Sequence, residues 1–210
     1  MFRFPGLGSL DLSHNDLKSV PTSAFHSVPG LKVLILSNNQ ISQVHDGALT
    51  GLADLKTLDL SGNRIVALPS TLFSSVPGLQ QLRLDHNELS VLSSRLFHPL
   101  TRLVVMDLSS NLLRADCDTC LTQRSFQGLA SLIVLNLSNN HISRLQPGLF
   151  EDLANLQILD GSHNQIEQIP QGNRQSNKIS KTCLTFKKLS SLKTGMSGMR
   201  WYITIPPGVK

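Results

Sequence analysis

The 210-residue sequence lacks long apolar runs. The longest unbroken runs are about four residues, such as 103–106 and 132–135, whereas a membrane-spanning helix needs about 20. We therefore expect no helix that crosses a bilayer. The first residues, Met1 to Pro5, also lack the apolar segment of a secretory signal. This start predicts either a cytosolic protein or a sequence that is incomplete at its N-terminus.

Large aromatic residues are also scarce, with one Trp, one Tyr and eight Phe. Leucine takes their place, and 35 of the 38 leucines precede residue 171. Hydrophobic residues make up 40% of the chain, which excludes wholesale disorder. A composition so rich in one large side chain indicates a single packing arrangement that is used repeatedly.

Acidic residues are absent from the last forty positions. Residues 1–170 hold 11 Lys or Arg and 14 Asp or Glu, a net charge of −3, whereas residues 171–210 hold 8 basic residues, a net charge of +8. The overall charge of +5 therefore belongs to the C-terminal tail. Nucleic-acid binding calls for basic residues arrayed on a folded face, and the body offers none, so we predict no nucleic-acid partner.

A repeated frame dominates the first 170 residues. Seven segments share the frame L-x-x-L-x-L-x-x-N-x-[LI], with a step of 24 residues except for one step of 29. Its asparagines are Asn15, Asn39, Asn63, Asn87, Asn111, Asn140 and Asn164. Between the frames a second apolar column reads Phe25, Leu49, Phe73, Phe97, Phe126 and Phe150.

This frame resembles the leucine-rich repeat family, in its 24-residue form common in extracellular proteins. The alternation L-x-L is the period of a strand with one buried face, and parallel strands need a crossover, which the remainder of each unit supplies. The fold class predicted is an α/β leucine-rich repeat solenoid, or horseshoe, of seven rungs with a parallel sheet on its concave face. The resemblance implies that each frame Asn is buried and bonds to backbone groups of the turn.

The repeats depart from the frame in three places. The fifth unit carries five extra residues within 113–121, and Gly161 replaces a core Leu in the seventh, which predicts a cavity there. The chain also opens in the middle of a unit, and neither end shows a cysteine-rich cap. We therefore expect a solenoid over residues 1–170 that is a fragment of a longer one; a complete but poorly capped small protein is the alternative.

The sequence after Pro170 loses the repeat. We predict that residues 171–210 form a basic tail that is disordered or an artefact of the gene model. Two alternatives stay open: a degenerate eighth repeat around 186–192, and contact of the basic residues with anionic lipid or nucleic acid.

Residues with catalytic or metal-binding side chains do not form a known site. Asp, Ser and His recur together in several rungs, but nothing singles out one nucleophile, and no nucleophile-elbow, phosphate-loop or dinucleotide motif is present. Cys117 and Cys120 lack the second pair that zinc would need. They are loop thiols or a local disulfide, with Cys183 as another pairing partner in an oxidising compartment. We predict no enzyme activity, no metal and no cofactor.

The exposed face of the sheet is the candidate binding surface. Val105, Val134 and Ile158 occupy one column in the last three rungs and form an apolar strip beside Asp107 and Asp160. Apolar residues in register on a solvated face favour a protein partner. Asn136 begins the one N-x-[ST] sequon of the chain and is a candidate glycosylation site beside this strip.

Residues 103–169 resemble the ectodomain of arthropod-type Toll receptors. The stretches that carry this narrower resemblance are 103–109, the longer fifth unit, 125–129, 132–140, 150–153 and 156–159. The resemblance implies an extracellular segment of a cell-surface receptor, with roles in innate immunity or development. Its partner would be a protein ligand on the concave face or a second receptor chain. The alternative is a secreted or cell-surface adhesion or matrix protein built from the same repeats.

Overall fold

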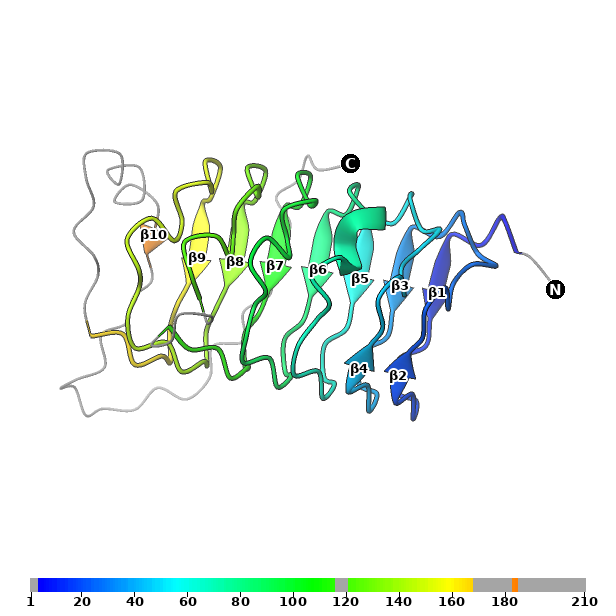
Figure 1. Cartoon of the computed structure of the whole chain (residues 1–210), viewed down its shortest axis with the longest axis horizontal. Coiled ribbons are helices and arrows are strands. Elements are labelled where there is room, and N and C mark those ends of the chain that lie inside the picture. Colours follow the sequence, from blue (N-terminus) through cyan, green and yellow to red (C-terminus); the bar gives the residue numbers. More distant parts are fainter. Residues whose placement is uncertain (1–3, 116–120, 168–182, 185–210) are drawn as a thin grey trace.

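The computed structural model describes residues 4–115, 121–167 and 183–184 and shows a solenoid of stacked turns (Figure 1). One parallel sheet runs along the whole solenoid in the order β1-β3-β5-β6-β7-β8-β9-β10. Its strands are β1 Ser9–Asp11, β3 Val33–Ile35, β5 Thr57–Asp59, β6 Gln81–Arg83, β7 Val105–Asp107, β8 Val134–Asn136, β9 Ile158–Asp160 and β10 Cys183–Leu184. The seven predicted strands are therefore confirmed, one for each frame; we number the turns that carry them rungs one to seven.

The opposite side of each turn holds little regular structure. Rungs one and two pair through a second parallel sheet of β2 (Ser19–Val20) and β4 (Gln43–Val44). Rung three contains the one helix of the described residues, the 3-10 turn η1 (Leu72–Ser75). Each of these segments is the crossover that connects one parallel strand to the next. Because the crossovers in the described residues hold short strands and one 3-10 turn, the solenoid has almost no helix.

The eighth strand was not predicted. Cys183 pairs with Ile158 and Leu184 pairs with Leu159, so β10 extends the sheet beyond β9. This strand lies within the predicted tail, and it differs from the eighth-repeat alternative, whose echo falls at 186–192. The rest of the tail lies outside the described residues, as does the Cys117–Cys120 pair.

The core consists of the frame leucines and the aromatic column. The leucines of rungs two to six are almost fully buried, and so are Phe73, Phe97 and Phe126. The rings of Phe73 and Phe97 lie 5.8 Å apart between centroids, so the aromatic column continues from one rung to the next. Burial falls off in rung one, where Leu7, Leu10 and Leu12 are only half-buried. A single turn cannot bury its own leucines, and each rung therefore depends on both neighbours.

The frame asparagines form a ladder of hydrogen bonds beneath the sheet. Asn87 Nδ2 donates to the carbonyl of Leu60 at 2.9 Å and to that of Leu84 at 3.1 Å. Its Oδ1 accepts the backbone N–H of Ile65 at 3.0 Å. Leu60 and Ile65 both belong to the preceding rung, so one buried amide satisfies backbone groups of two rungs.

The longer fifth rung keeps its place in this ladder. Asn140 Oδ1 accepts the N–H of Leu113 at 3.0 Å, although the two residues are 27 positions apart rather than the usual 22. Leu121 N–H donates to the Arg114 carbonyl at 3.0 Å, which closes the loop that contains the extra residues. The insertion therefore leaves the stacking of rungs five and six unchanged.

The residue before each frame Asn adopts a left-handed backbone conformation. Seven residues share φ values from 52° to 64°: His14, Asn38, Gly62, His86, Ser110, Asn139 and His163. Left-handed φ turns the chain sharply away from the strand and aims the next side chain, the Asn, into the core. Asn and Gly tolerate this region best, and together they fill three of the seven positions.

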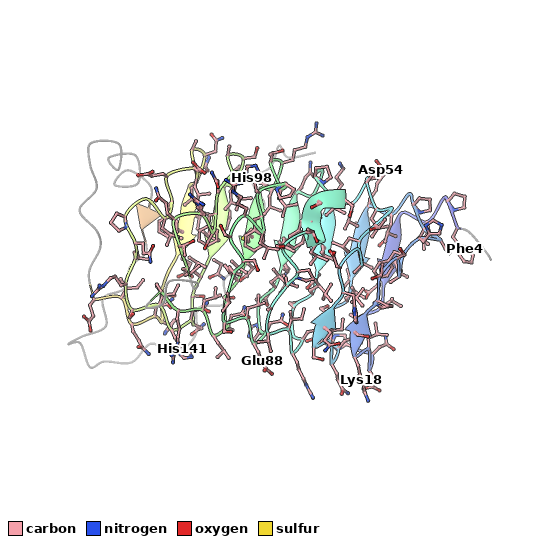
Figure 2. All side chains as sticks on the ribbon, in the orientation of Figure 1. Phe4, Lys18, Asp54, Glu88, His98 and His141 are labelled. Carbon is pink, nitrogen blue, oxygen red and sulfur yellow. The ribbon has the colours of Figure 1, made fainter. Side chains whose placement is uncertain are left out.

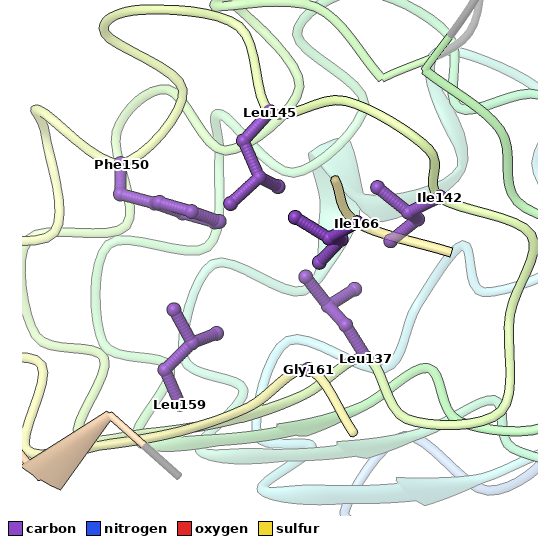
Figure 3. A pocket seen from close by; sticks show the side chains of 7 residues that line it. All are labelled: Leu137, Ile142, Leu145, Phe150, Leu159, Gly161 and Ile166. Carbon is purple, nitrogen blue, oxygen red and sulfur yellow. The ribbon is translucent and has the colours of Figure 1, made fainter. Parts of the chain in front are cut away.

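The cavity predicted at Gly161 is present. A small apolar cavity in rung seven is lined by Leu137, Ile142, Leu145, Phe150, Leu159, Gly161 and Ile166 (Figure 3). Gly161 lies at its edge, at the position where six earlier rungs carry Leu. The missing side chain leaves the surrounding apolar groups without contacts on one side.

We predict that Asn87→Ala lowers the free energy of unfolding by roughly 1–3 kcal/mol, because buried backbone groups of two rungs lose their partner. Chemical denaturation monitored by circular dichroism measures this change. Asn15→Ala is the matched control, because Asn15 is exposed in the terminal rung, and it should cost much less. Equal losses for both variants would contradict the ladder.

We predict that Gly161→Leu raises the free energy of unfolding by roughly 1 kcal/mol, because the new side chain fills the apolar cavity of rung seven. Gly161→Ala should give a smaller gain in the same denaturation experiment. A loss of stability in both variants would show that the cavity does not admit a side chain from this position.

Candidate functional site

The predicted apolar strip lies in register on the sheet. Val105 pairs with Val134, and Val134 pairs with Ile158, so the three side chains are direct neighbours on β7, β8 and β9. Parallel strands are about 4.8 Å apart, which makes the strip a continuous row. Val105 and Val134 are half-buried, and Ile158 is 50% exposed. The most exposed part of the strip is therefore Ile158 on β9.

Two further apolar residues widen this surface. Val104 and Ile133 precede Val105 and Val134 directly, and both are half-buried. The Val104 carbonyl accepts the N–H groups of Ile133 and Val134, at 2.9 and 3.1 Å, so these positions also stack. In rungs one to four the same position holds Gly8, Lys32, Lys56 and Gln80. The sequence reasoning missed this column, although reading the position before the strip would have revealed the change from polar to apolar residues.

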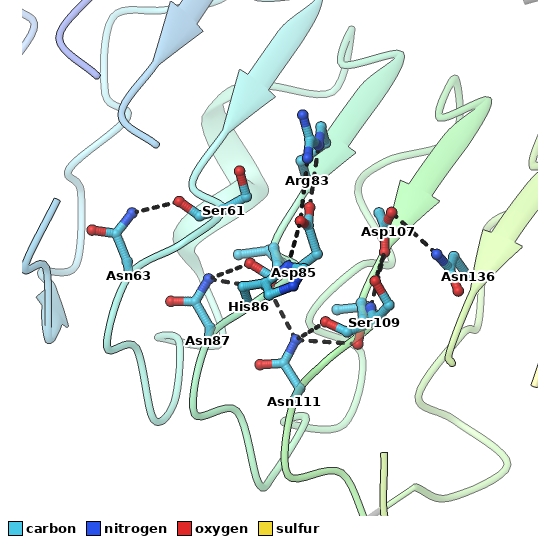
Figure 4. Close-up of polar contacts among 12 residues, drawn as sticks. Ser61, Asn63, Arg83, Asp85, His86, Asn87, Asp107, Ser109, Asn111 and Asn136 are labelled. Carbon is cyan, nitrogen blue, oxygen red and sulfur yellow. Dashed lines mark hydrogen bonds and ion pairs between the residues drawn. The ribbon is translucent and has the colours of Figure 1, made fainter. Parts of the chain in front are cut away.

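Asp107 is more buried than a residue of a solvated face should be. It is 8% exposed, and its Oδ1 accepts both the N–H of Ser109 at 2.9 Å and the hydroxyl of Ser109 at 2.6 Å. Its Oδ2 accepts the amide of Asn136 at 3.2 Å (Figure 4). Burial raises the pKa of Asp107, and the hydrogen bonds from Ser109 oppose that rise. Asp107 therefore holds the end of its strand in place and also contributes charge beside the strip.

Asp160 accepts the same kind of backbone hydrogen bond as Asp107 but is more exposed to solvent. Its Oδ1 accepts the N–H of Ser162 at 2.9 Å, and the residue is half-buried. Asp11 and Asp59 make the equivalent bond to Ser13 and Ser61, both at 2.9 Å. The recurring Asp–Ser pairs of the sequence are thus Asx turns that end the strands.

An ion-pair cluster lies in the middle of the same face. Arg83 Nε donates to Asp85 at 3.1 Å, and its second terminal nitrogen donates to the other oxygen of Asp85 at 3.2 Å (Figure 4). A third bond, of 3.3 Å, joins Arg83 to Asp59 on the neighbouring strand. His86 Nδ1 lies 3.0 Å from Asp85. The repeat gives no signal of this pairing, because Asp85 stands where the other rungs carry Ser.

The sequon at Asn136 lies within β8, beside the strip. Asn136 Oδ1 accepts the N–H and the hydroxyl of Ser138, at 3.0 and 2.8 Å. Its Nδ2, the atom that a glycan would occupy, donates to Asp107. Leu137 and Ser138 are buried. A glycan here would replace one amide proton that can bond to Asp107 and would stand over Val134.

Two further features concern metal binding and membranes. Residues 4–115 and 121–167 contain no group of three or more His, Cys, Asp or Glu side chains arranged to hold a metal. In the same part of the chain, no helix is long and apolar enough to cross a bilayer.

We predict that Asp107→Asn changes the pH dependence of stability. The folded pKa of Asp107 lies above that of an unfolded Asp, about 4, so the folded chain binds a proton more tightly and stability falls as pH rises between the two values. Asn does not titrate, so the variant does not lose this contribution to stability as the pH rises. The free energy of unfolding of the variant minus that of the unmodified chain should therefore be larger at about pH 7 than at about pH 4. Denaturation curves at both pH values measure the difference, and parallel profiles would contradict it.

Comparison with known proteins agrees with the repeat architecture. The family model for the leucine rich repeat matches residues 5–65, 55–113 and 119–166. A curated protein, Tsukushi of Xenopus tropicalis, is 37% identical over 68 residues, which are 32% of this chain and 19% of Tsukushi. The solved TLR13–ssRNA13 complex contains a chain that is similar over 74% of this one, with 32% identity and a TM-score of 0.69.

The chain spans only about a fifth of either relative's length: 19% of Tsukushi and 21% of the TLR13 chain. The three family matches together cover well over half of the sequence, and they coincide with the seven stacked rungs. The frame, the parallel sheet and these matches agree, and the chain belongs to the leucine-rich repeat family.

Proposed function

We propose that this chain is the protein-binding leucine-rich repeat segment of a Toll-like cell-surface receptor, and that rungs five to seven of its concave face take the ligand. The observation that carries the proposal is the apolar strip of Val105, Val134 and Ile158, whose pairing places three apolar side chains in a row. Contiguous apolar surface of this kind marks a protein contact more often than chance.

The charges around the strip define the partner further. Asp107 and Asp160 flank it on the same face, and in those rungs no basic residue shares their column. A protein ligand with apolar side chains framed by Lys or Arg fits this arrangement. The apolar contact supplies about 25 cal/mol per Å² buried, while the acids speed the encounter and orient the ligand.

The likeness to TLR13 supports a receptor over the adhesion or matrix alternative. That likeness extends over 74% of this chain at 32% identity. The two kinds of protein differ in the segments C-terminal to the repeats, because a receptor continues into a membrane span and a signalling domain. A full-length transcript distinguishes them.

Nucleic acid is not part of the proposed ligand. The solved TLR13 chain is in complex with a single-stranded RNA, so that ligand class needs a test in this chain as well. We predict no nucleic-acid partner because the body has no array of basic side chains on a folded face, and in the column of Asp107 the acids Asp11, Asp59, Asp107 and Asp160 outnumber the single Arg83. Phosphate groups bind to clustered Lys and Arg side chains, whereas this column carries more acidic than basic side chains.

We predict that Val134→Asp reduces ligand binding at least about tenfold while the free energy of unfolding falls by no more than about 1 kcal/mol. The substitution places a charge in the strip without touching a core leucine. Binding is measured by interferometry against an array of secreted proteins and receptor ectodomains, and every protein bound by the unmodified chain is measured again with the variant.

Thr57→Asp is the matched control, because Thr57 occupies the same column two rungs before the strip. It adds the same charge and should leave binding within about twofold, as expected for a change outside the contact. Equal sensitivity to both variants would place the ligand elsewhere, and unfolding of Val134→Asp would show that the column is part of the core.

A further inference from the structure

Rung four departs from its neighbours at two positions of the concave face. It carries Arg83 in the column where rungs three and five carry Asp59 and Asp107, and Asp85 where the other rungs carry Ser. Asp59 and Asp107 each accept the N–H group two positions later, at 2.9 Å, and so end their strands in an Asx turn. Arginine has no acceptor and cannot make that bond. Rung four therefore carries an Arg83–Asp85 pair in place of this turn.

Three hydrogen bonds fix the guanidinium of Arg83. Nε and one terminal nitrogen donate to the two oxygens of Asp85, at 3.1 and 3.2 Å, and the other terminal nitrogen donates to Asp59 at 3.3 Å (Figure 4). The side chains of Asp85 and Asp59 are only 6% and 13% exposed, whereas that of Arg83 is 51% exposed. Two buried carboxylates thus hold one half-exposed guanidinium in a single orientation.

These bonds leave the flat face of the guanidinium available to a ligand. Its N–H groups lie in the plane of the group, so the three bonds occupy its edges and not its faces. Two carboxylates within 3.3 Å already balance its charge, and Asp107 pairs in register with Arg83 on the next strand. A ligand anion would meet these acids. An uncharged aromatic ring fits better, because arginine stacks on aromatic faces.

Arg83 lies beside the N-terminal end of the strip. Gln81 on β6 pairs with Val105 on β7, so the column of the strip passes two residues before Arg83. Strands about 4.8 Å apart and a rise of about 3.3 Å per residue place the Cα atoms of Arg83 and Val105 roughly 8 Å apart. A ligand segment that covers the strip therefore reaches Arg83 with a side chain about two positions further along.

We propose that Arg83 is the stacking position for an aromatic side chain of the protein ligand, next to the apolar side chains that cover the strip. This inference rests on the proposed function, because one ligand segment makes both contacts. The three hydrogen bonds pre-organise Arg83, so little side-chain entropy is lost when the ring binds. Arginine, tryptophan and tyrosine are the side chains that most often dominate protein interfaces, and this contact joins arginine to an aromatic partner.

Capped peptides test the stacking position without knowledge of the natural ligand. The probe carries Trp and Leu two positions apart, so that both side chains lie on one side of an extended peptide. Two matched peptides carry Leu or Glu in place of Trp. Each is titrated to about 10 mM into the whole isotope-labelled chain in reductant, because contacts of two side chains are weak. The measured signal is the Nε–H resonance of Arg83, assigned by its loss in Arg83→Lys.

The Trp peptide should shift the Arg83 resonance upfield, because a ring over the guanidinium shields it. It should also bind about three- to fivefold more tightly than the Leu peptide. Arg83→Lys keeps the positive charge but loses the flat face, so it should remove this preference. Arg64→Lys is the matched control and should retain it. Arg64 directly follows a frame Asn, as does Glu88, which is labelled at the lower edge of Figure 2, away from the strands.

Three results overturn the inference. One is an Arg83 resonance that stays in place or moves equally with the Trp and Leu peptides. Another is tighter binding of the Glu peptide, which would identify an anion site. The third is a Trp preference that persists in Arg83→Lys, once circular dichroism shows that this variant folds; otherwise the resonance of the unmodified chain decides. The proposed function fails by a different result, namely protein binding that Val134→Asp leaves unchanged, so the two failures are distinguishable.

Discussion

The structure depends on the buried amide beneath each strand. Every rung must turn away from the sheet, and the turn leaves backbone groups that water does not reach. In rungs two to seven one Asn satisfies groups of its own turn and of the preceding one, as Asn87 does for Leu84, Leu60 and Ile65, whereas the exposed Asn15 of rung one bonds only within its own turn. The leucines supply most of the apolar burial, but leucines alone would not fix the spacing of successive turns. The amide ladder therefore determines the register in which the apolar core forms, and with it the columns on the concave face.

Much of this was predictable because the constraint is periodic. A buried amide at each step of 24 residues is visible in the sequence, and so are the core leucines and the cavity at Gly161, which the structure confirms. The pairing of Val105 with Val134 and of Val134 with Ile158 follows from the same step. Features that depend on differences between rungs were harder to predict. The apolar Val104 and Ile133 and the Arg83–Asp85 pair appear only when each column is read along its whole length.

Other features had no signal in the repeat. β10 adds to the sheet without a frame of its own, and its pairing with β9 reflects the open edge that the last rung leaves. The burial of Asp107 also departs from the expectation that its column faces solvent freely, because Asn136 and Ser109 lie over its two oxygens. In such places the neighbouring side chains, rather than the position in the frame, decide exposure and charge.

The closed loop of rung five has a consequence for how such chains diversify. Arg114 and Leu121 are joined by a backbone hydrogen bond, and Leu113 keeps its bond to Asn140 despite the added residues. Residues added between Arg114 and Leu121 therefore do not change the stacking of the other rungs. Most other positions would shift a strand or a core leucine if the chain grew by even one residue. The chain between Arg114 and Leu121 can therefore change in length while the strands and the core leucines keep their positions.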